Sequence, residues 1–106
     1  MNAIIRVSKT SMGKYLSVQW DDIFDVTFTP DKINYANIVS TCIKSLISDD
    51  SMQAIINNYL LDPEKEDTLE EFNKMQEVRS KCKVLAKRCM AAVASTEDYY
   101  EEEINL

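Results

Sequence analysis

The side chains that could take part in chemistry are carboxylates and thiols, because the sequence contains no histidine. Its absence removes Ser-His and Cys-His catalysis and every His-ligated metal site. Asp21, Asp22 and Asp25 lie close together, and two carboxylates alone could serve as general acid and base. No pattern around them indicates a pocket, and a turn followed by a solvated strand face accounts for them. The sequence therefore predicts a protein that is not an enzyme and holds no cofactor or metal.

The three cysteines, Cys42, Cys82 and Cys89, have no metal-ligand spacing. Cys82 and Cys89 lie two helical turns apart, which is about 10 Å along a helix axis and too far for a disulfide between them. Buried thiols in a reducing cytosol are the expected state. The single glycine, Gly13, also excludes a glycine-rich phosphate loop.

Charge is separated into blocks along the chain of 106 residues, whose formal net charge is −6. This acidic balance argues against general affinity for nucleic acid or anionic membranes and suits a neutral or basic partner. The acidic candidates for partner binding form two groups: Glu64, Glu66, Asp67, Glu70 and Glu71, and then Glu97, Asp98, Glu101, Glu102 and Glu103. The basic candidates flank the apolar stripe of one predicted helix: Lys74, Arg79, Lys81, Lys83, Lys87 and Arg88.

That helix is expected over residues 68–94, with a start after either Asp62 or Thr68 left open. Its apolar residues recur at alternating gaps of three and four, which is a heptad pattern. They form a core seam: Met75, Val78, Cys82, Leu85 and Cys89. Such a helix would be about 40 Å long, against about 33 Å for a compact domain of this size. Part of it should project or be covered by a partner.

The remaining elements predict an α+β fold. Period-two alternation over residues 3–28 indicates an antiparallel β-hairpin or three-stranded meander, with Gly13 in the first turn. Two shorter helices should follow, the first capped by Thr29 or Asn34 and the second opened by a capping box at Asp50. Together with the long amphipathic helix they would cover one sheet face. Residues 1–96 are expected to form a single domain, and residues 97–106 an acidic, frayed tail.

The expected function is that of a small acidic protein-binding module in the cytoplasm, without a membrane span, that modulates and inhibits a macromolecular partner. Phages and other mobile elements encode inhibitors of this general make-up against host nucleic-acid-handling machinery, which would make the protein a host-defence antagonist. An antiparallel homodimer through the long helix is predicted, because the acidic stretch 64–71 of one copy would lie beside the basic stretch 79–88 of the other. The alternative is a nucleic-acid-binding regulator that uses the basic flanks.

Overall fold

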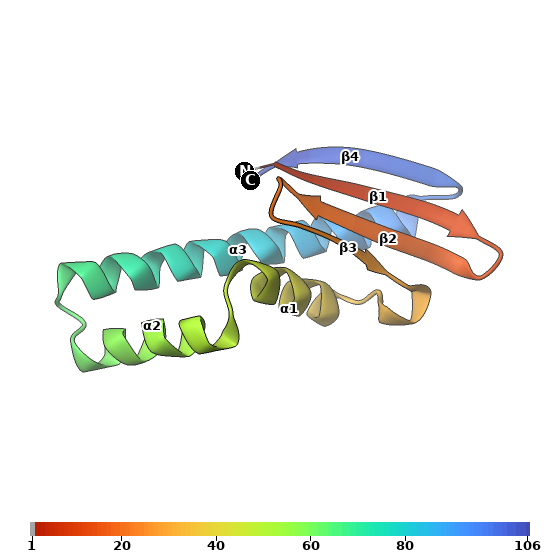
Figure 1. Ribbon diagram of the computed structural model, residues 1–106. Helices are drawn as coiled ribbons and strands as arrows, with labels where there is room; N and C mark the ends of the chain where they lie inside the picture. The colour runs from red at the N-terminus through yellow and green to blue at the C-terminus, as the bar shows by residue number, and fades with distance from the viewer. Residues whose placement is uncertain (1) are drawn as a thin grey trace.

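Four antiparallel strands and three helices make up the part of the chain that the computed structural model describes, residues 2–106 (Figure 1). This α+β arrangement confirms the predicted fold class. The strands are β1 (Asn2–Thr10), β2 (Gly13–Trp20), β3 (Phe24–Phe28) and β4 (Tyr99–Asn105). The helices are α1 (Tyr35–Leu46), α2 (Asp49–Leu61) and α3 (Glu66–Ser95), and a single 3₁₀ turn, Pro30–Lys32, precedes α1.

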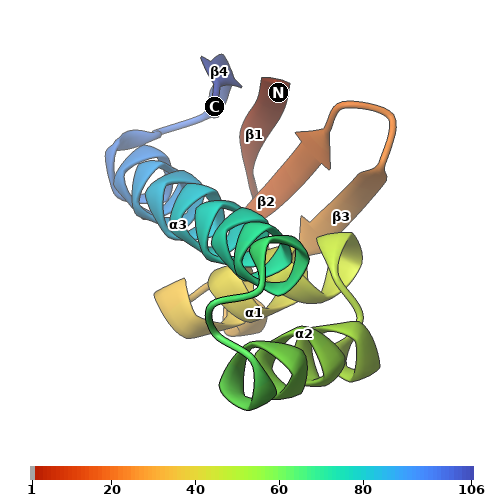
Figure 2. The ribbon, with the colours of Figure 1, turned by 90° about the vertical axis from the view of Figure 1, so that its left-hand side faces the viewer.

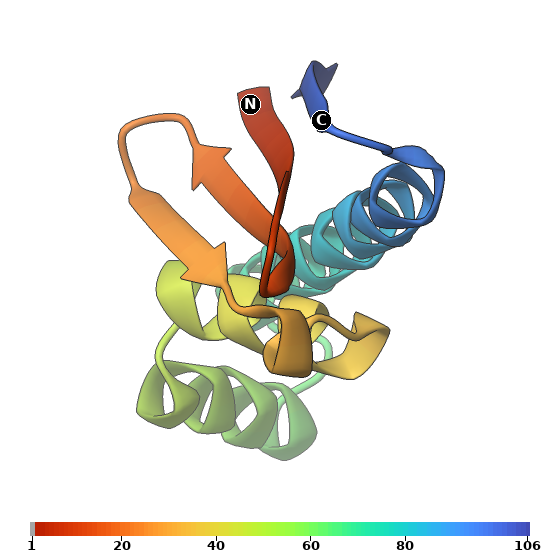
Figure 3. The same cartoon turned by 90° about the vertical axis from the view of Figure 1, so that its right-hand side faces the viewer.

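The sheet has the order β3-β2-β1-β4, and the helices lie on only one of its faces (Figures 2 and 3). Side chains alternate between the two faces along each strand, so every second residue meets the helices. Ile5 pairs with Val18, and Val7 with Leu16, in the register that brings the apolar residues together. The buried residues of the sheet are Ala3, Ile5, Val7, Leu16, Val18, Trp20, Phe28 and Ile104.

The turn between β1 and β2 depends on Gly13, as the sequence predicted. Its φ is +123°, a conformation that side-chain-bearing residues rarely adopt. A Cβ at this position would also lie 3.0 Å from Cγ of Pro30, so the turn packs closely on the 3₁₀ segment. Gly13 therefore has both a conformational and a packing reason to be glycine.

The prediction of a frayed tail over residues 97–106 is wrong, because Tyr99–Asn105 form strand β4. This strand pairs with β1 along its whole length, and the Lys9 amide donates to the Asp98 carbonyl at 2.8 Å just before the strand begins. The acidic composition concealed a period-two pattern whose inward residues include the buried Ile104. The sheet is thus completed by the last residues of the chain.

The long helix α3 begins at Glu66, so neither expected start, after Asp62 or after Thr68, is correct. Thr68 does not cap the helix; its hydroxyl donates to the carbonyl oxygens of Asp62 and Lys65 at 2.7 and 3.0 Å. At the other end, Lys14 Nζ donates to the Val93 carbonyl at 2.6 Å. A cation at a helix C-terminus satisfies a free carbonyl and complements the helix dipole.

The two shorter helices have side-chain caps. Asn34, one of the two candidates, accepts a hydrogen bond from the Asn37 amide at 2.8 Å and caps α1. The capping box predicted at Asp50 is wrong, because Ser48 caps α2 by accepting from the Ser51 amide at 3.1 Å. Both cap oxygens satisfy an amide in the first turn that would otherwise have no helical partner.

The molecule is elongated, measuring 53 × 25 × 21 Å along its principal axes, because α3 contains 30 residues. The first half of α3 extends beyond the sheet and runs beside α2 (Figure 1). The rings of Tyr59 and Phe72 stack there with centroids 4.1 Å apart. The expected excess length is therefore real, and this chain's own α2 covers part of it.

Candidate protein-binding surfaces

The predicted core seam of α3 faces the inside of the protein. Met75, Cys82, Leu85 and Cys89 are buried, and Val78 is partly buried. Ala86 is also buried but lies outside the heptad pattern, so its burial was not predicted. Because the sheet and the two shorter helices of the same chain already pack against α3, this seam is not available to a second helix. The antiparallel dimer stays a prediction, and it has to use another face of α3.

The three thiols are free and buried at the contact between α1 and α3. A hydrogen bond with Cys82, reinforced by burial, raises the pKa of Cys42. Burial raises the pKa of Cys89 to about 12. Nucleophilic attack requires a thiolate, so Cys42 and Cys89 are held in the unreactive form at neutral pH.

The aspartates near the β2–β3 turn have structural contacts. Asp21 adopts a φ of +43°, and its Oδ1 accepts a hydrogen bond from the Asn2 amide at 2.9 Å. Asp22 is exposed, and Asp25 accepts from Ser17 Oγ at 3.4 Å on the open sheet face. Within residues 2–106, no three Asp, Glu, Cys or His side chains come together in a way that could hold a metal ion.

The first acidic group gathers at one end of the molecule, around the connection between α2 and α3. Leu60 and Leu61 are 70% and 84% exposed in the last turn of α2, and Leu69 is 38% exposed in the first turns of α3. We define the acidic tip as these leucines with the exposed carboxylates beside them: Asp62, Glu64, Glu66, Asp67, Glu70 and Glu71. Five of these six carboxylates were predicted from the sequence as partner-binding residues, whereas Asp62 and the exposed leucines were not.

The second acidic group does not form one surface, because β4 distributes it over both faces of the sheet. Glu101 and Glu103 lie on the open face, where Glu101 Oε1 accepts from Arg6 Nε at 2.5 Å. Glu102 points to the helices, accepts a hydrogen bond from the Tyr100 hydroxyl at 2.6 Å and forms an ion pair with Arg88. Glu97 and Asp98 are exposed in the connection before the strand.

The six basic candidates on α3 divide into two edges. Lys74 pairs with Glu70 and Lys81 with Glu77, both at 3.1 Å, while Arg88 pairs with Glu102. This edge therefore faces β4 and is largely neutralised within the chain. On the other edge, no ion pair among residues 2–106 involves Arg79, Lys83 or Lys87, and Lys83 and Lys87 are exposed. We call Arg79, Lys83 and Lys87 the basic row.

The basic row lies along the side of α3 next to α1. Figures 2 and 3 show β4 and α1 at the two borders of the face that α3 turns toward the protein. The Arg88–Glu102 ion pair assigns the first edge to β4. At 100° per residue, Lys83 and Arg88 lie on opposite sides of Cys82 around the helix. The basic row consequently borders α1.

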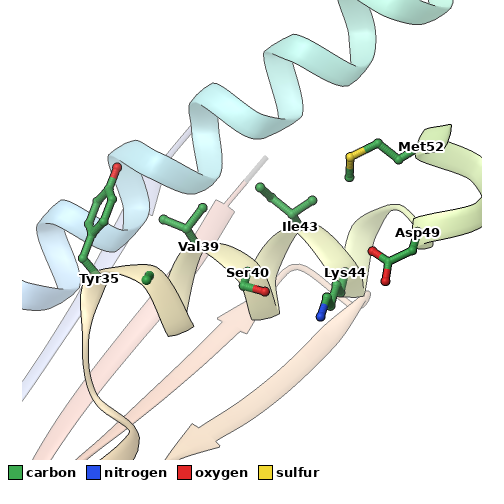
Figure 4. Close-up of a pocket in the computed structure, with 8 residues that line it drawn as sticks. Tyr35, Val39, Ser40, Ile43, Lys44, Asp49 and Met52 are labelled. Carbon is green, nitrogen blue, oxygen red and sulfur yellow. The ribbon is translucent and has the colours of Figure 1, made fainter. Parts of the chain in front are cut away.

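An apolar depression of about 410 Å³ runs along α1 and ends at α2. Tyr35, Val39 and Ile43 are spaced by four residues and point to the same side of α1, and Met52 of α2 stands beyond them (Figure 4). We define the α1 groove by its lining residues: Tyr35, Ala36, Val39, Ser40, Ile43, Lys44, Asp49 and Met52. Lys44 and Asp49 are its charged residues, and both are exposed.

The chain matches no protein-family model, and comparisons with curated proteins and with solved structures give no match either. Within residues 2–106, no helix has both the length and the apolar character that a membrane crossing requires. The acidic tip, the basic row and the α1 groove are the candidate binding surfaces of the described residues.

Proposed function

We propose that the protein is a small, non-enzymatic protein-binding module that modulates a macromolecular partner through the acidic tip. The observation that carries this proposal is the exposure of Leu60 and Leu61, at 70% and 84%, on adjacent positions of one helical turn. Exposed leucines that lie together and are rimmed by charge are typical of a protein-interaction site. The free thiols suit a cytoplasmic location.

The partner implied by this surface has an apolar pocket with a basic rim. Apolar burial would supply most of the affinity, and the carboxylates from Glu64 to Glu71 would steer association and align the two surfaces. Basic surfaces of this kind occur on proteins that handle nucleic acids, which is the class of host machinery expected from the sequence. Occupation of such a surface by the acidic tip would exclude its nucleic acid and so inhibit the partner.

The test compares the double variant Leu60→Ser/Leu61→Ser with Met12→Ser, a control that alters an equally exposed apolar residue in the β1–β2 turn. Proteins captured from host lysate by the wild type are identified, and each is then purified and titrated. We expect a partner whose affinity falls at least tenfold with the tip variant and as salt increases, but not with the control. Equal binding by all three proteins would refute the proposal.

A further inference from the structure

The α1 groove is an apolar surface that this chain leaves open. Val39, Ile43 and Met52 are only partly buried, and Tyr35 remains 39% exposed at the end of the groove. A depression of about 410 Å³ falls in the range of protein sites that take up apolar groups. The groove is elongated, since its lining residues follow α1 and continue onto α2 (Figure 4). It is shaped for side chains presented by a helix or a turn.

The net charge around the groove is positive. In its wall the charges of Lys44 and Asp49 offset each other, and the basic row of α3, which borders α1, adds three cations. Lys83 and Lys87 are exposed and have no ion pair within residues 2–106, in contrast to Lys74 and Arg88 on the opposite edge of the helix. An occupant should therefore combine apolar side chains with carboxylates.

The acidic tip of the same chain has this combination. Leu60, Leu61 and Leu69 supply exposed apolar side chains, and Asp62, Glu64, Glu66 and Asp67 lie next to them with Lys65 as the one cation. The tip and the groove are at different ends of α3, so a chain cannot fill its own groove with its own tip (Figure 1). A second copy can.

We propose that the α1 groove of one copy receives the acidic tip of a second copy, and that the exchange is reciprocal. The helix α3 is about 45 Å long, with the tip at its start and the groove beside its second half. When two such helices run antiparallel, each tip comes to lie at the level of the other groove. A two-fold axis between them makes both contacts identical and closes the assembly as a dimer.

The outer face of α3 permits the two helices to approach. Between the tip and the groove this face carries Asn73, Gln76 and Ser80, which are exposed and uncharged, and Glu77, whose charge is offset by its ion pair with Lys81. The core seam stays inside each copy, so dimer formation does not require any part of the fold to open. The proposed dimer keeps the antiparallel direction predicted from the sequence and adds the α1 groove as the site that receives the acidic stretch of the second copy.

This dimer has a functional consequence that rests on the proposed function. The same tips that are proposed to bind a partner are covered in the dimer, so a partner has to compete with the second copy. Affinity for the partner should then weaken as the concentration of the protein rises above the dissociation constant of the dimer. Self-association would keep the binding surface covered until a partner with a better-fitting pocket is present.

The test exchanges charge between the two contacting surfaces. The variant Lys83→Glu/Lys87→Glu makes the groove side acidic, and the variant Glu64→Lys/Glu66→Lys/Asp67→Lys turns the tip from net negative to net positive. Alone, each variant sets like charges against each other at both contacts and should be monomeric by light scattering, while the wild type at tens of micromolar should have twice the monomer mass of 12.2 kDa. Mixed in equal amounts, the two variants place opposite charges at both contacts, and a heterodimer should form.

Two controls keep the outcome interpretable. Circular dichroism must show that both variants are folded, and the reversal Lys9→Glu, at an exposed residue of strand β1, should leave the dimer intact. A monomeric wild type, or variants that dimerise alone, would overturn the proposal. A wild-type monomer that still captures a partner through Leu60 and Leu61 would refute the dimer but leave the proposed function intact. A dimer that captures no partner would support the dimer and count against the proposed function.

Discussion

The two halves of α3 differ in what covers them. In the second half, Cys82, Leu85, Ala86, Cys89 and Ala92 are all buried against the sheet and α1. In the first half only Met75 is buried, and α2, which runs beside it, contains no buried residue at all. The second half therefore holds the fold together, and the first half is a projecting arm whose surface is available for binding. One continuous helix connects the two, so the arm is held rigidly relative to the core.

The largest expected difference between the two halves of α3 is in how much a leucine in each half contributes to the free energy of unfolding. Leu85→Ala, in the buried half, should lower the free energy of unfolding by about 2–5 kcal/mol, because it removes buried methyl groups and leaves a cavity. Leu61→Ala, in the arm, should change it by less than about 0.5 kcal/mol, because that side chain is 84% exposed. Urea denaturation measures both values. Similar losses for the two variants would mean that the arm is part of the core.

The burial of the second half of α3 could be predicted from the sequence because its buried positions recur at a regular spacing. The heptad spacing of Cys82, Leu85 and Cys89 reports one buried stripe along the helix, and the structure buries all three. In the structure the sheet and α1 cover this stripe, in agreement with the expectation that the long helix packs on one sheet face. Periodicity identifies which side of a helix is buried but not what covers it.

The candidate surfaces could be predicted only in part, for reasons that differ from place to place. Carboxylates such as Glu70 are visible in a sequence, but the exposure of Leu61 depends on where α2 stops relative to α3. The open groove beside Val39 depends in the same way on how far α2 extends over α1. β4 was missed because Glu101, Glu102 and Glu103 in succession outweighed the alternation that Ile104 completes. The run of carboxylates predicted a solvated tail, but hydrogen bonding to β1 makes these residues a strand.

Alkaline pH should lower the free energy of unfolding through the thiol of Cys89, which lies in the buried half of α3. The folded protein raises the pKa of Cys89 from its ordinary value of 9.0 to about 12, so the unfolded chain loses this proton first as pH rises. The contribution of the protonated Cys89 thiol to the free energy of unfolding is complete below pH 9.0 and is lost between pH 9.0 and about 12. The loss is about 1.4 kcal/mol per pH unit for one thiol. Urea denaturation across this range measures the slope. Cys89→Ala should have a shallower slope than the wild type, and an identical slope would contradict the assignment.

Within the arm, the strongest single contact should be the stack of Tyr59 on Phe72. Their centroids are 4.1 Å apart and the rings are inclined by only 10°, which joins α2 to α3. A double-mutant cycle with Tyr59→Leu and Phe72→Leu should give a coupling energy of about 0.5–1.5 kcal/mol. Amide hydrogen exchange on the same proteins should show faster opening of α2 while the sheet is unaffected. Exchange that accelerates equally throughout the chain would show that the arm unfolds only with the core.

The smallest expected difference is in how much the ion pairs of the two halves of α3 contribute to stability. Glu102 is less exposed than Glu70 and also accepts a hydrogen bond from Tyr100, so Glu102→Gln should cost up to about 1 kcal/mol. The exposed pair of Glu70 with Lys74 spans one helical turn, and Glu70→Gln should cost only about 0.2–0.5 kcal/mol, a loss that high salt removes. Thermal unfolding of both variants at low and high salt makes the comparison. If Glu70→Gln proved the more harmful, the arm would contribute to stability through its charges, and its carboxylates could not be free to serve a partner alone.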